Sequence, residues 1–487
     1  MKNKHYIAIF VFLLLGCTLF FFLYPFFVQR KSYNEELKTL RNIVQKDQRV
    51  FESMLKRIED APTLEKKYIV ALNAIDYTRY HSIGYFSSDI LEDVFLTMAQ
   101  ALDFPLSDDF EPNSTLHVAS ELYSHGGHSR ALERWIENSS DDEKHSVFLT
   151  RPSYISERLI EAVDRKNGEI YQVPKKISLL ERTTELRKIA SRYERIVLHI
   201  HMDDYIPLLA FGTEKFKRPV FLFNHADHRF WLGVSIADCI ISLSTRGYNF
   251  SKDYRGGLNN CLLPLPIDKK SAERPLMSKL ELRRKLKLPE DKKIIFASGS
   301  SVKFEPMLQY NFANFIEKIA KKRSDVFFLI IGPKNLEPNI SPDRFLAIKV
   351  VPNDVYRLYL ASADLVIDSF PMTGATAMID AISMGIPVLS THTPTGQADY
   401  IVHSNAYTHS IDELVDKTLL VLDNPHVGIS ILSQITDLLE KETDVNNWLK
   451  QKKDIYSRYK THAVHQFKPV KKTVETYDEL DFFLTKQ

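Results

Sequence analysis

Short apolar runs alternate with helical stretches along most of this chain, and the runs fall into two series. Those of the first series are rich in Val, Ile and Phe, and they are Leu116–Ala119, Val147–Leu149, Ile196–Ile200, Val220–Phe223 and Cys239–Leu243. Those of the second series are Ile294–Ala297, Val326–Ile331, Ala347–Val351, Leu365–Ile367 and Val388–Leu389. Such runs between helices are typical of parallel strands in a sheet covered on both faces. The pattern predicts an α/β protein with two Rossmann-like, doubly wound domains.

We expect the first domain over residues 112–268 and the second over residues 290–410. The first series ends at the proline-containing segment Leu262–Asp268, and a charged, linker-like segment follows it. Parallel sheets of this kind bind ligands at the carboxyl ends of their strands, so two joined domains predict a ligand site in the cleft between them. Over residues 411–487 the pattern is helical again, which predicts a C-terminal helical tail.

The N-terminal part of the chain carries an apolar run, Tyr6–Val28, without a single charge. Its length suits a helix that spans a bilayer. The run is too long for a cleaved signal peptide, and no small-residue cleavage site follows it. A lipoprotein signal at Leu14–Cys17 is the weaker alternative, because the residues after Cys17 stay apolar. We therefore expect a transmembrane anchor over residues 6–28.

Basic residues on the two sides of this run predict its orientation. Lys2 and Lys4 precede the run. A larger group follows it, made up of Arg30, Lys31, Lys38, Arg41, Lys46 and Arg49. Positive charge is retained on the cytoplasmic side of a membrane. This asymmetry predicts a single-pass protein of the bacterial inner (cytoplasmic) membrane, with its catalytic body in the cytoplasm.

Residues 29–111 are predicted to form a helical stalk region. Apolar side chains recur there in a heptad pattern that Asp47 interrupts, at Leu37, Leu40, Val44, Phe51, Met54, Ile58 and Ala61. A helical stalk that ends at Pro62 fits this pattern, and it would allow self-association. The alternative is an amphipathic helix packed on its own domain. The pattern does not decide between the two.

Charge and cysteine content narrow the class of partner. The 64 Lys and Arg residues nearly balance the 62 Asp and Glu residues, which leaves a formal net charge of +2. This balance offers no electrostatic argument for nucleic acid as a partner. The cysteines Cys17, Cys239 and Cys261 have no metal-ligand spacing, and three cysteines in 487 residues are typical of a reducing compartment.

The first candidate site is the segment Ser124–Ser129, which follows the first apolar run and opens a helix. Gly126 and Gly127 let the backbone approach a ligand at the helix N-terminus. His128 is a candidate general base, because imidazole titrates near neutral pH. The alternative is a plain tight turn capped by Ser129.

The second candidate site is the segment Phe223–Trp231, which also follows an apolar run. His225, Asp227, His228 and Arg229 crowd this strand end, and this favours a sugar or acceptor site over a structural network. Asp227 would orient an imidazole as the carboxylate of a catalytic triad does, so His228 is a second candidate base. A metal site is the weaker alternative, since the two histidines have no evident further ligand.

The third candidate site is the segment Ala297–Phe304, after the first strand of the second domain. Small residues such as Ser301 free the backbone amides for phosphate oxygens, and Lys303 adds a positive charge. The alternative is a solvated loop lysine.

The fourth candidate site is the segment Asp368–Val388, in which a strand leads through a loop of small residues into a helix. The residues whose amides and hydroxyls would hold a diphosphate at that helix N-terminus are Thr373, Gly374, Ala375 and Thr376. Asp380, one turn into the helix, would accept hydrogen bonds from ribose hydroxyls. The alternative for Asp380 is a solvated helix carboxylate.

The fourth segment, together with Ser301–Pro306, resembles the donor domain of two-domain Leloir glycosyltransferases with the GT-B fold. Over residues 290–400 it is similar to the O-linked N-acetylglucosamine transferase group and related bacterial glycosyltransferases. By that resemblance, Lys303 meets the donor diphosphate, the threonines 373 and 376 bind phosphate, and Asp380 holds the ribose. In the first domain the resemblance covers the architecture and the glycine-rich segment Gly126–His128.

The sequence also departs from the pattern of this group. The tetratricopeptide array of the protein-modifying members is absent from it. Many retaining members carry paired glutamates, but Met372 and Asp380 stand at those positions here. We therefore expect inversion at the anomeric carbon.

The resemblance implies a glycosyltransferase of the hexosyl- or N-acetylhexosaminyltransferase type. It would move a sugar from a nucleotide-sugar donor, a UDP-sugar being favoured, to a glycan, lipid-linked or protein acceptor in surface glycan assembly or glycosylation. The nucleotide sugar is a substrate, so we expect no cofactor. We also expect no metal, because Asp203-Asp204 is not a persuasive metal-binding motif. The alternatives are a nucleotide-sugar 2-epimerase, a polyol-phosphate transferase on the same fold, and a catalytically inactive membrane-anchored scaffold.

Overall fold

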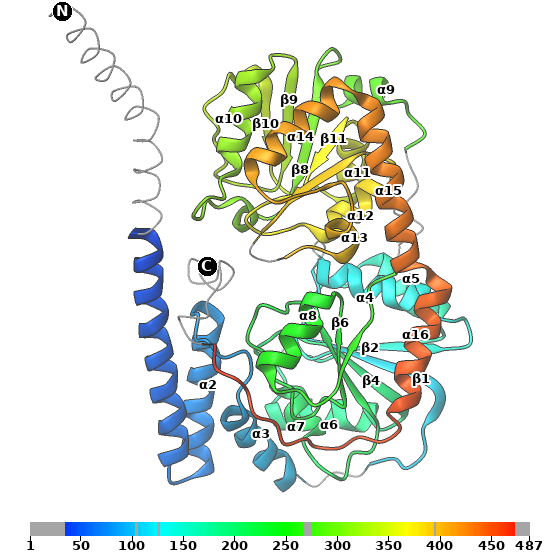
Figure 1. Cartoon of the computed structure of the whole chain (residues 1–487). Coiled ribbons are helices and arrows are strands. Elements are labelled where there is room, and N and C mark those ends of the chain that lie inside the picture. Colours follow the sequence, from blue (N-terminus) through cyan, green and yellow to red (C-terminus); the bar gives the residue numbers. More distant parts are fainter. Residues whose placement is uncertain are drawn as a thin grey trace, which may run out of the picture.

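Two parallel sheets, each covered by helices, lie one above the other in the computed structural model of the chain (Figure 1). The structure describes residues 35–102, 106–123, 127–174, 176–266, 275–393 and 396–472. The carboxyl ends of the strands in each sheet point toward the other sheet. The predicted pair of parallel α/β sheets is therefore right.

The first sheet has seven parallel strands in the order β3-β2-β1-β4-β5-β6-β7. Its strands are β1 (Glu111–Ala119), β2 (Lys144–Leu149), β3 (Ile170–Gln172), β4 (Tyr193–His199), β5 (Val220–Asn224), β6 (Cys239–Ser242) and β7 (Asn260–Leu262). Its helices are α4 (Gly127–Asn138), α5 (Glu157–Arg165), α6 (Leu179–Ala190), α7 (Ile206–Phe211) and α8 (Thr245–Phe250). A π-helical turn, Ser251–Arg255, continues α8. All five residues of β5 are buried, as expected for a central parallel strand with both faces covered.

The second sheet has six parallel strands in the order β10-β9-β8-β11-β12-β13. Its strands are β8 (Lys293–Ser298), β9 (Val326–Ile331), β10 (Phe345–Ile348), β11 (Leu365–Ile367), β12 (Val388–Thr391) and β13 (Tyr407–Thr408). Its helices are α9 (Lys279–Lys285), α10 (Phe312–Lys322), α11 (Asn353–Ala361), α12 (Ala375–Ser383), α13 (Asp399–Val402) and α14 (Ile411–Asp423). Two 3₁₀ turns, Ser301–Phe304 and Pro342–Arg344, complete this domain.

The predicted C-terminal tail is shared between the two domains. Helices α14 and α15 (Pro425–Thr443) pack within the second domain. The next helix, α16 (Val445–Arg458), crosses to the first domain, where Trp448, Ile455 and Tyr456 are buried against its sheet (Figure 1). Residues 459–472 then run in extended conformation along the first domain. The helical pattern was visible in the sequence, but it carried no information on which domain each apolar face packs against.

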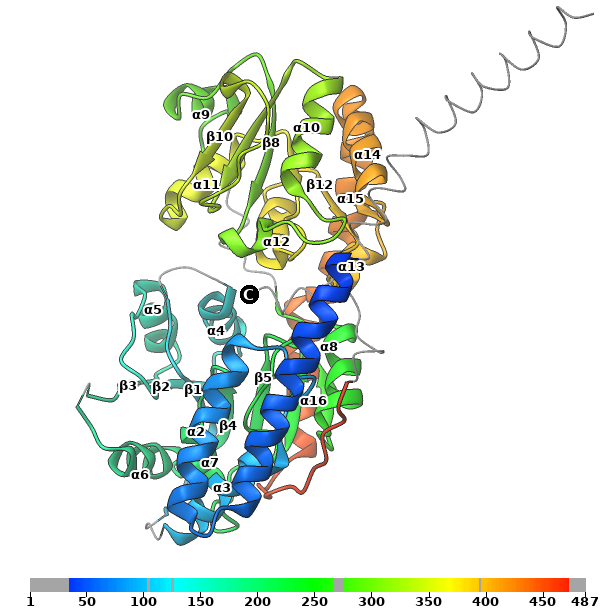
Figure 2. The same cartoon turned by 90° about the vertical axis from the view of Figure 1, so that its left-hand side faces the viewer.

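Three helices precede the first sheet, and they belong to its domain. They are a helix over residues 35–60, α2 (Leu64–Tyr80) and α3 (Asp89–Ala101). The first of them lies alongside α2 (Figure 2). Its side chains Phe51, Leu55 and Ile58 pack into the core of the first domain. This half of the predicted stalk is therefore an amphipathic helix packed on its own domain, which was the alternative interpretation.

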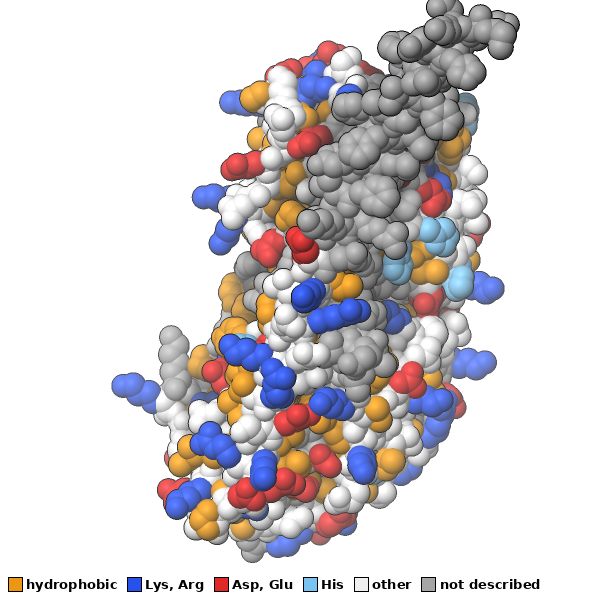
Figure 3. Space-filling view, turned by 60° about the vertical axis from the view of Figure 1, so that its left-hand side comes forward, with side chains coloured by type: hydrophobic (Ala, Val, Ile, Leu, Met, Phe, Trp, Pro, Cys, Tyr) orange, Lys and Arg blue, Asp and Glu red, His pale blue; other side chains and the backbone are white. Residues whose placement is uncertain are grey.

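The opposite face of that helix is polar. Lys46, Arg49 and Arg57 surround a shallow hollow on it. Figure 3 shows basic side chains interspersed with acidic ones on this side of the molecule. The alternation of apolar and charged positions in the heptad pattern thus separates a buried face from a solvated one.

The predicted transmembrane anchor and the membrane location derived from it are corrected by the structure. None of the helices that the structure describes is both long enough and apolar enough to cross a bilayer. The helix over residues 35–60, for example, carries charged residues on every turn of its exposed face. The apolar run over residues 6–28 lies outside the described residues.

Candidate functional site

A cavity of about 420 Å³ lies between the two domains, and both contribute to its walls. The cavity brings together eight of the residues that the sequence analysis singled out. They are Gly127, His128, His225, Asp227, His228, Lys303, Thr373 and Thr376. All eight follow the carboxyl end of a parallel strand, which is where the topology of such sheets predicts a ligand site.

Other predicted site residues do not line this cavity. Among them, Ser301 is turned away, and its hydroxyl accepts a hydrogen bond from the Lys334 amide at 2.8 Å. The Gly374 amide donates to a carboxylate oxygen of the buried Asp368 at 2.7 Å, so that amide has a partner within its own loop. The others are Asp380 and Arg229. Gly126 lies outside the described residues.

His128 lies in the first turn of α4, with its ring at the cavity wall. Its Nε2 lies 2.9 Å from the backbone carbonyl oxygen of His199. A carbonyl oxygen only accepts, so Nε2 carries the proton and Nδ1 keeps its lone pair in the neutral ring. Among the residues that the structure describes, this Nδ1 has no hydrogen-bond partner. His128 therefore presents a buried acceptor nitrogen at the cavity.

Burial, with a smaller contribution from the charge of His201, lowers the pKa of His128 to about 4. The ring is therefore neutral near pH 7, which is the state that a general base requires. It stacks on His225 with ring centroids 4.1 Å apart. Burial also lowers the pKa of His225, so this stacked pair carries no net charge in the absence of ligand.

Asp227 stands at the centre of a second group on the same wall. One carboxylate oxygen lies 3.3 Å from His228 Nδ1, and the other accepts from Arg246 at 2.8 Å. Burial raises the pKa of Asp227, but the His228 hydrogen bond and the Arg246 charge outweigh it and lower the pKa to about 2. Asp227 is therefore ionised and accepts a hydrogen bond from His228 Nδ1, which orients that imidazole.

The second domain contributes a positive charge to the opposite wall. Lys303, in the 3₁₀ turn after β8, donates from Nζ to the backbone carbonyl oxygen of Thr373 at 2.5 Å. Burial lowers the pKa of this lysine, and the nearby Asp368 opposes the shift. The N-terminus of α12 follows two residues later, with Thr376 at the cavity. A lysine beside a helix N-terminus suits a bound anion.

Asp380 joins the two domains in this structure. It lies on α12, and its two carboxylate oxygens accept from Arg130 at 2.8 Å and from Arg134 at 3.2 Å, both on α4. The Asp380 and Arg134 side chains are only 3% and 1% exposed. The role that the resemblance implies for Asp380, holding a ribose, stays a prediction. The two arginines stand four residues apart on α4, and this spacing, which puts both on one helix face, was available in the sequence.

The sequence analysis missed several residues of the cavity. Arg246 comes from α8, which the alternation of runs did not single out, and Glu442 comes from the end of α15. Burial, together with the charge of Asp399, raises the pKa of Glu442 to about 7. Asp399 also accepts hydrogen bonds from the Thr245 amide and hydroxyl across the domain boundary. No local sequence pattern indicates that these distant segments meet.

Comparisons with known proteins place the fold. No protein-family model matches the chain, and no curated protein matches its sequence. Among solved structures, HepE of Anabaena in complex with UDP and glucose aligns with a TM-score of 0.54 at 12% identity, covering 70% of this chain and 99% of that one. A glycosyltransferase from Rickettsia africae aligns with a TM-score of 0.53 at 11% identity, covering 72% and 99%.

An O-GlcNAc transferase mutant of Thermobaculum terrenum aligns with a TM-score of 0.50 at 12% identity, covering 81% of each chain. Identities this low carry the likeness of fold and nothing finer. Together with the two facing parallel sheets and the cavity between them, these structural alignments show that this chain has the two-domain GT-B fold of those glycosyltransferases.

Proposed function

We propose that the chain is a glycosyltransferase that moves a sugar from a nucleotide-sugar donor to an acceptor hydroxyl in the cavity between its domains. The observation that carries the proposal is the pairing of two unlike walls. A lysine and a helix N-terminus lie on the second domain, and neutral imidazoles lie on the first. Transfer of a sugar from a nucleoside diphosphate needs a site for the departing anion and a proton acceptor for the attacking hydroxyl.

On the donor side, Lys303 and the hydroxyls of Thr373 and Thr376 are the proposed ligands of the diphosphate. A fixed positive charge and a helix N-terminus stabilise the negative charge that develops on the leaving group. A UDP-sugar is the favoured donor. HepE, which shares the fold, has been crystallised with UDP-glucose, and this supports uridine as the nucleoside of the donor.

On the acceptor side, His128 is the proposed general base, through Nδ1. Proton transfer to Nδ1 would give His128 a positive charge. The backbone carbonyl oxygen of His199, which already accepts a hydrogen bond from Nε2, would face that charged ring. His228, oriented by Asp227, is the second candidate for this role. With a base opposite the donor, we expect in-line attack and inversion, without a metal or a cofactor. The proposed acceptor is a glycan, lipid-linked or protein hydroxyl in surface glycan assembly or glycosylation.

The first experiment is a donor screen on the full chain. Thermal unfolding is measured with UDP, GDP, CMP and CDP and their sugar or polyol conjugates, for the wild type and for Lys303→Ala. We expect one nucleoside diphosphate to raise the midpoint of thermal unfolding of the wild type and to have no such effect on the variant. Lys293→Ala is the matched control, because Lys293 is exposed at the opposite end of the same strand, β8.

The donor found in this way is then incubated with the enzyme, with and without acceptors. Transfer that depends on an acceptor supports the proposal. Conversion of the donor sugar without any acceptor would instead identify an epimerase, and consumption of a CDP-polyol would identify a polyol-phosphate transferase. A folded protein that no nucleotide stabilises would overturn the proposal.

A further inference from the structure

Three histidines lie side by side in the first sheet, beneath the cavity, and the proposed reaction does not use their side chains. They are His117 on β1, His145 on β2 and His199 on β4, and none of them is exposed. His117 is the middle member. Its Nδ1 lies 3.0 Å from His199 Nε2, and its Nε2 lies 2.9 Å from His145 Nδ1. The three rings form one hydrogen-bonded row across three neighbouring strands.

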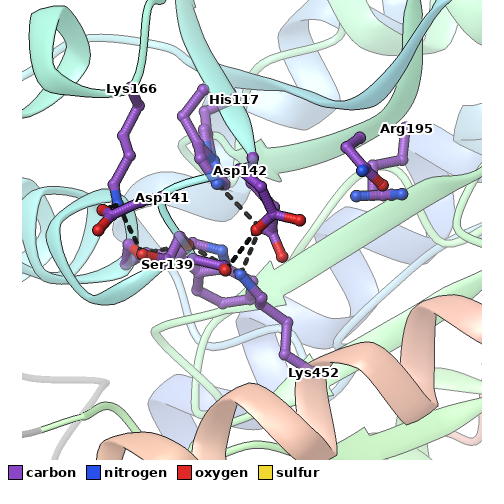
Figure 4. Close-up of polar contacts among 12 residues, drawn as sticks. His117, Ser139, Asp141, Asp142, Lys166, Arg195 and Lys452 are labelled. Atoms are coloured by element: carbon purple, nitrogen blue, oxygen red, sulfur yellow. Dashed lines mark hydrogen bonds and ion pairs between the residues drawn. The ribbon is translucent and has the colours of Figure 1, made fainter.

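The row ends at a carboxylate on the side away from the cavity. His145 Nε2 lies 3.0 Å from Glu143 Oε2, and Lys452 Nζ, from α16, donates to the same oxygen at 2.6 Å. Figure 4 shows Lys452 reaching from its helix toward Ser139, whose hydroxyl also accepts from it at 2.8 Å. Burial raises the pKa of Glu143, but these two donors outweigh it and lower the pKa to about 2. Glu143 is therefore ionised and can only accept hydrogen bonds.

The Glu143 carboxylate determines which ring nitrogens in the row donate hydrogen bonds and which accept them. Burial lowers the pKa values of all three histidines, so the rings are neutral and each carries one N–H. Because Glu143 only accepts, the proton of His145 must be on Nε2, and its Nδ1 must accept. His117 therefore donates from Nε2, and its Nδ1 accepts from His199 Nε2. Every ring in the row is the Nε2–H tautomer.

The other end of the row lies next to the proposed base. His199 Nδ1 is left with a lone pair, and it finds no hydrogen-bond partner among the described residues. The backbone carbonyl oxygen of the same residue accepts from His128 Nε2, so the two histidines are neighbours. A positive charge on His128 acts on His199, and after burial it is the next cause that lowers the pKa of His199.

We propose that Glu143 is a positioning residue for the reaction proposed above, because it fixes the tautomers of His145, His117 and His199 and so leaves an unprotonated ring nitrogen on His199, the residue whose backbone carbonyl oxygen binds the base His128. A bare Nδ1 is the negative end of the imidazole dipole, so it stabilises the positive charge that His128 gains with the acceptor proton. With the opposite tautomer, an N–H at this position would oppose that charge. The role of His128 as base belongs to the proposed function, and the tautomers of the row do not depend on it.

Two variants that break the same buried ion pair separate this role from a structural one. Glu143→Ala removes the acceptor and leaves the ammonium of Lys452, which only donates and which binds the same Glu143 oxygen as His145 Nε2 in the wild type. We expect the row to reverse, so that His199 Nδ1 becomes protonated. Lys452→Met removes the other partner of the pair and keeps the carboxylate, so the Nε2–H tautomers are expected to remain.

The tautomers are read by solid-state ¹⁵N NMR on the full chain labelled at histidine, because protonated and bare ring nitrogens have different chemical shifts. Signals are assigned by replacing each of the three histidines in turn with Gln. Turnover of the donor and acceptor found in the screen is measured in parallel. We expect kcat to fall about 10-fold in Glu143→Ala, as for a loss of about 1.4 kcal/mol in the transition state, with little change in KM.

Lys452→Met should keep a kcat near that of the wild type. Glu143→Gln, whose side-chain oxygen still accepts, should restore the Nε2–H tautomers and most of the lost turnover. The proposal would be overturned if any of the three histidines of the row is not the Nε2–H tautomer in the wild type. Equal losses of kcat in Glu143→Ala and Lys452→Met would also overturn it. If the wild type turns over no donor, the proposed function fails, whereas the NMR spectra still test the direction that Glu143 imposes.

Discussion

The two walls of the cavity follow the same topology but carry different chemistry. On the first domain, the side chains after β1 and β5 include the neutral rings of His128 and His225, and the Asp227–His228 pair. On the second domain, the segments after β8 and β11 carry Lys303, a loop of small residues and the N-terminus of α12. One wall holds groups that take up or release a proton, and the other holds a fixed positive charge.

This difference has a physical origin in burial. Burial lowers the pKa values of His128 and His225, so both imidazoles stay neutral and each can still accept a proton. Lys303 is also buried, but Asp368 and the Thr373 carbonyl oxygen stabilise its charge. In the proposed function the two walls therefore have separate roles, with proton transfer on the first domain and anion binding on the second.

The largest effect is expected from His128→Gln. If the first wall supplies the base, kcat should fall by about 10²–10⁴-fold, the usual contribution of general base catalysis. The affinity for the donor nucleotide should not change, because the second wall is intact. Steady-state kinetics and calorimetric titration with the nucleoside diphosphate check the two halves of the prediction. His403→Gln, at an exposed position, is the control. If donor affinity falls together with kcat, the two walls do not have separate roles.

The contact between the walls is tested by Asp380→Ala. This change leaves Arg130 and Arg134 without the carboxylate that both of them bind. Loss of one partner of a buried ion pair typically costs about 3–5 kcal/mol, so we expect a lower unfolding midpoint and a larger radius of gyration as the cleft opens. Calorimetry and small-angle X-ray scattering measure the two effects.

The matched control is Asp412→Ala, which breaks an exposed pair with Lys318 at 2.7 Å. It should cost less than about 1 kcal/mol. Equal effects of the two variants would mean that the Asp380 pair does not hold the domains together.

Both sheets and the ligand cleft were predictable from the sequence, because central parallel strands are short, continuous apolar runs that alternate with helical stretches. The edge strands β3 and β7, three residues each, were missed because they are short and only partly buried. The site residues next to strand ends were found, since topology alone brings them together.

Arg246 and Glu442 could not be found in this way. They reach the cavity through the packing of helices, and no local periodicity records which helix faces meet. The tautomer row was hidden for the same reason. His117, His145 and His199 stand within apolar strands, and only the order of the strands β2, β1 and β4 makes them neighbours.

A smaller effect is expected from Lys303→Met, which keeps the apolar stem and removes the charge. The hydrogen bonds of a charged group contribute about 1.5–3 kcal/mol, so the nucleoside diphosphate should bind about 10–100-fold more weakly. The affinity for the uncharged nucleoside should stay the same. Calorimetric titrations with the two ligands check this, and Lys293→Met is the control. Equal losses for the two ligands would mean that Lys303 shapes the loop and does not bind the anion.

The smallest effect, per residue and per pH unit, is the pH dependence that the histidines of the first domain impose on stability. Burial lowers the pKa values of His128 and His145 to about 4 in the folded protein, against an ordinary value of 6.5. Between pH 6.5 and 4 the unfolded chain therefore binds protons that the folded chain does not. Stability should fall as the pH falls through this window, by up to about 1.4 kcal/mol per pH unit for each such histidine.

In His145→Gln one of these groups is absent, so the free energy of unfolding should fall less steeply with decreasing pH than in the wild type. Urea unfolding at pH 7.5, 6.5, 5.5 and 5 measures the slope. The two curves should run parallel between pH 7.5 and 6.5, and below pH 6.5 the wild type should lose stability faster than the variant, whatever the difference in stability at pH 7. Curves that stay parallel down to pH 5 would mean that His145 takes up its second proton as readily in the folded protein as in the unfolded chain. The Nε2–H tautomers deduced for the row would then hold only above about pH 6.5, because they depend on neutral rings.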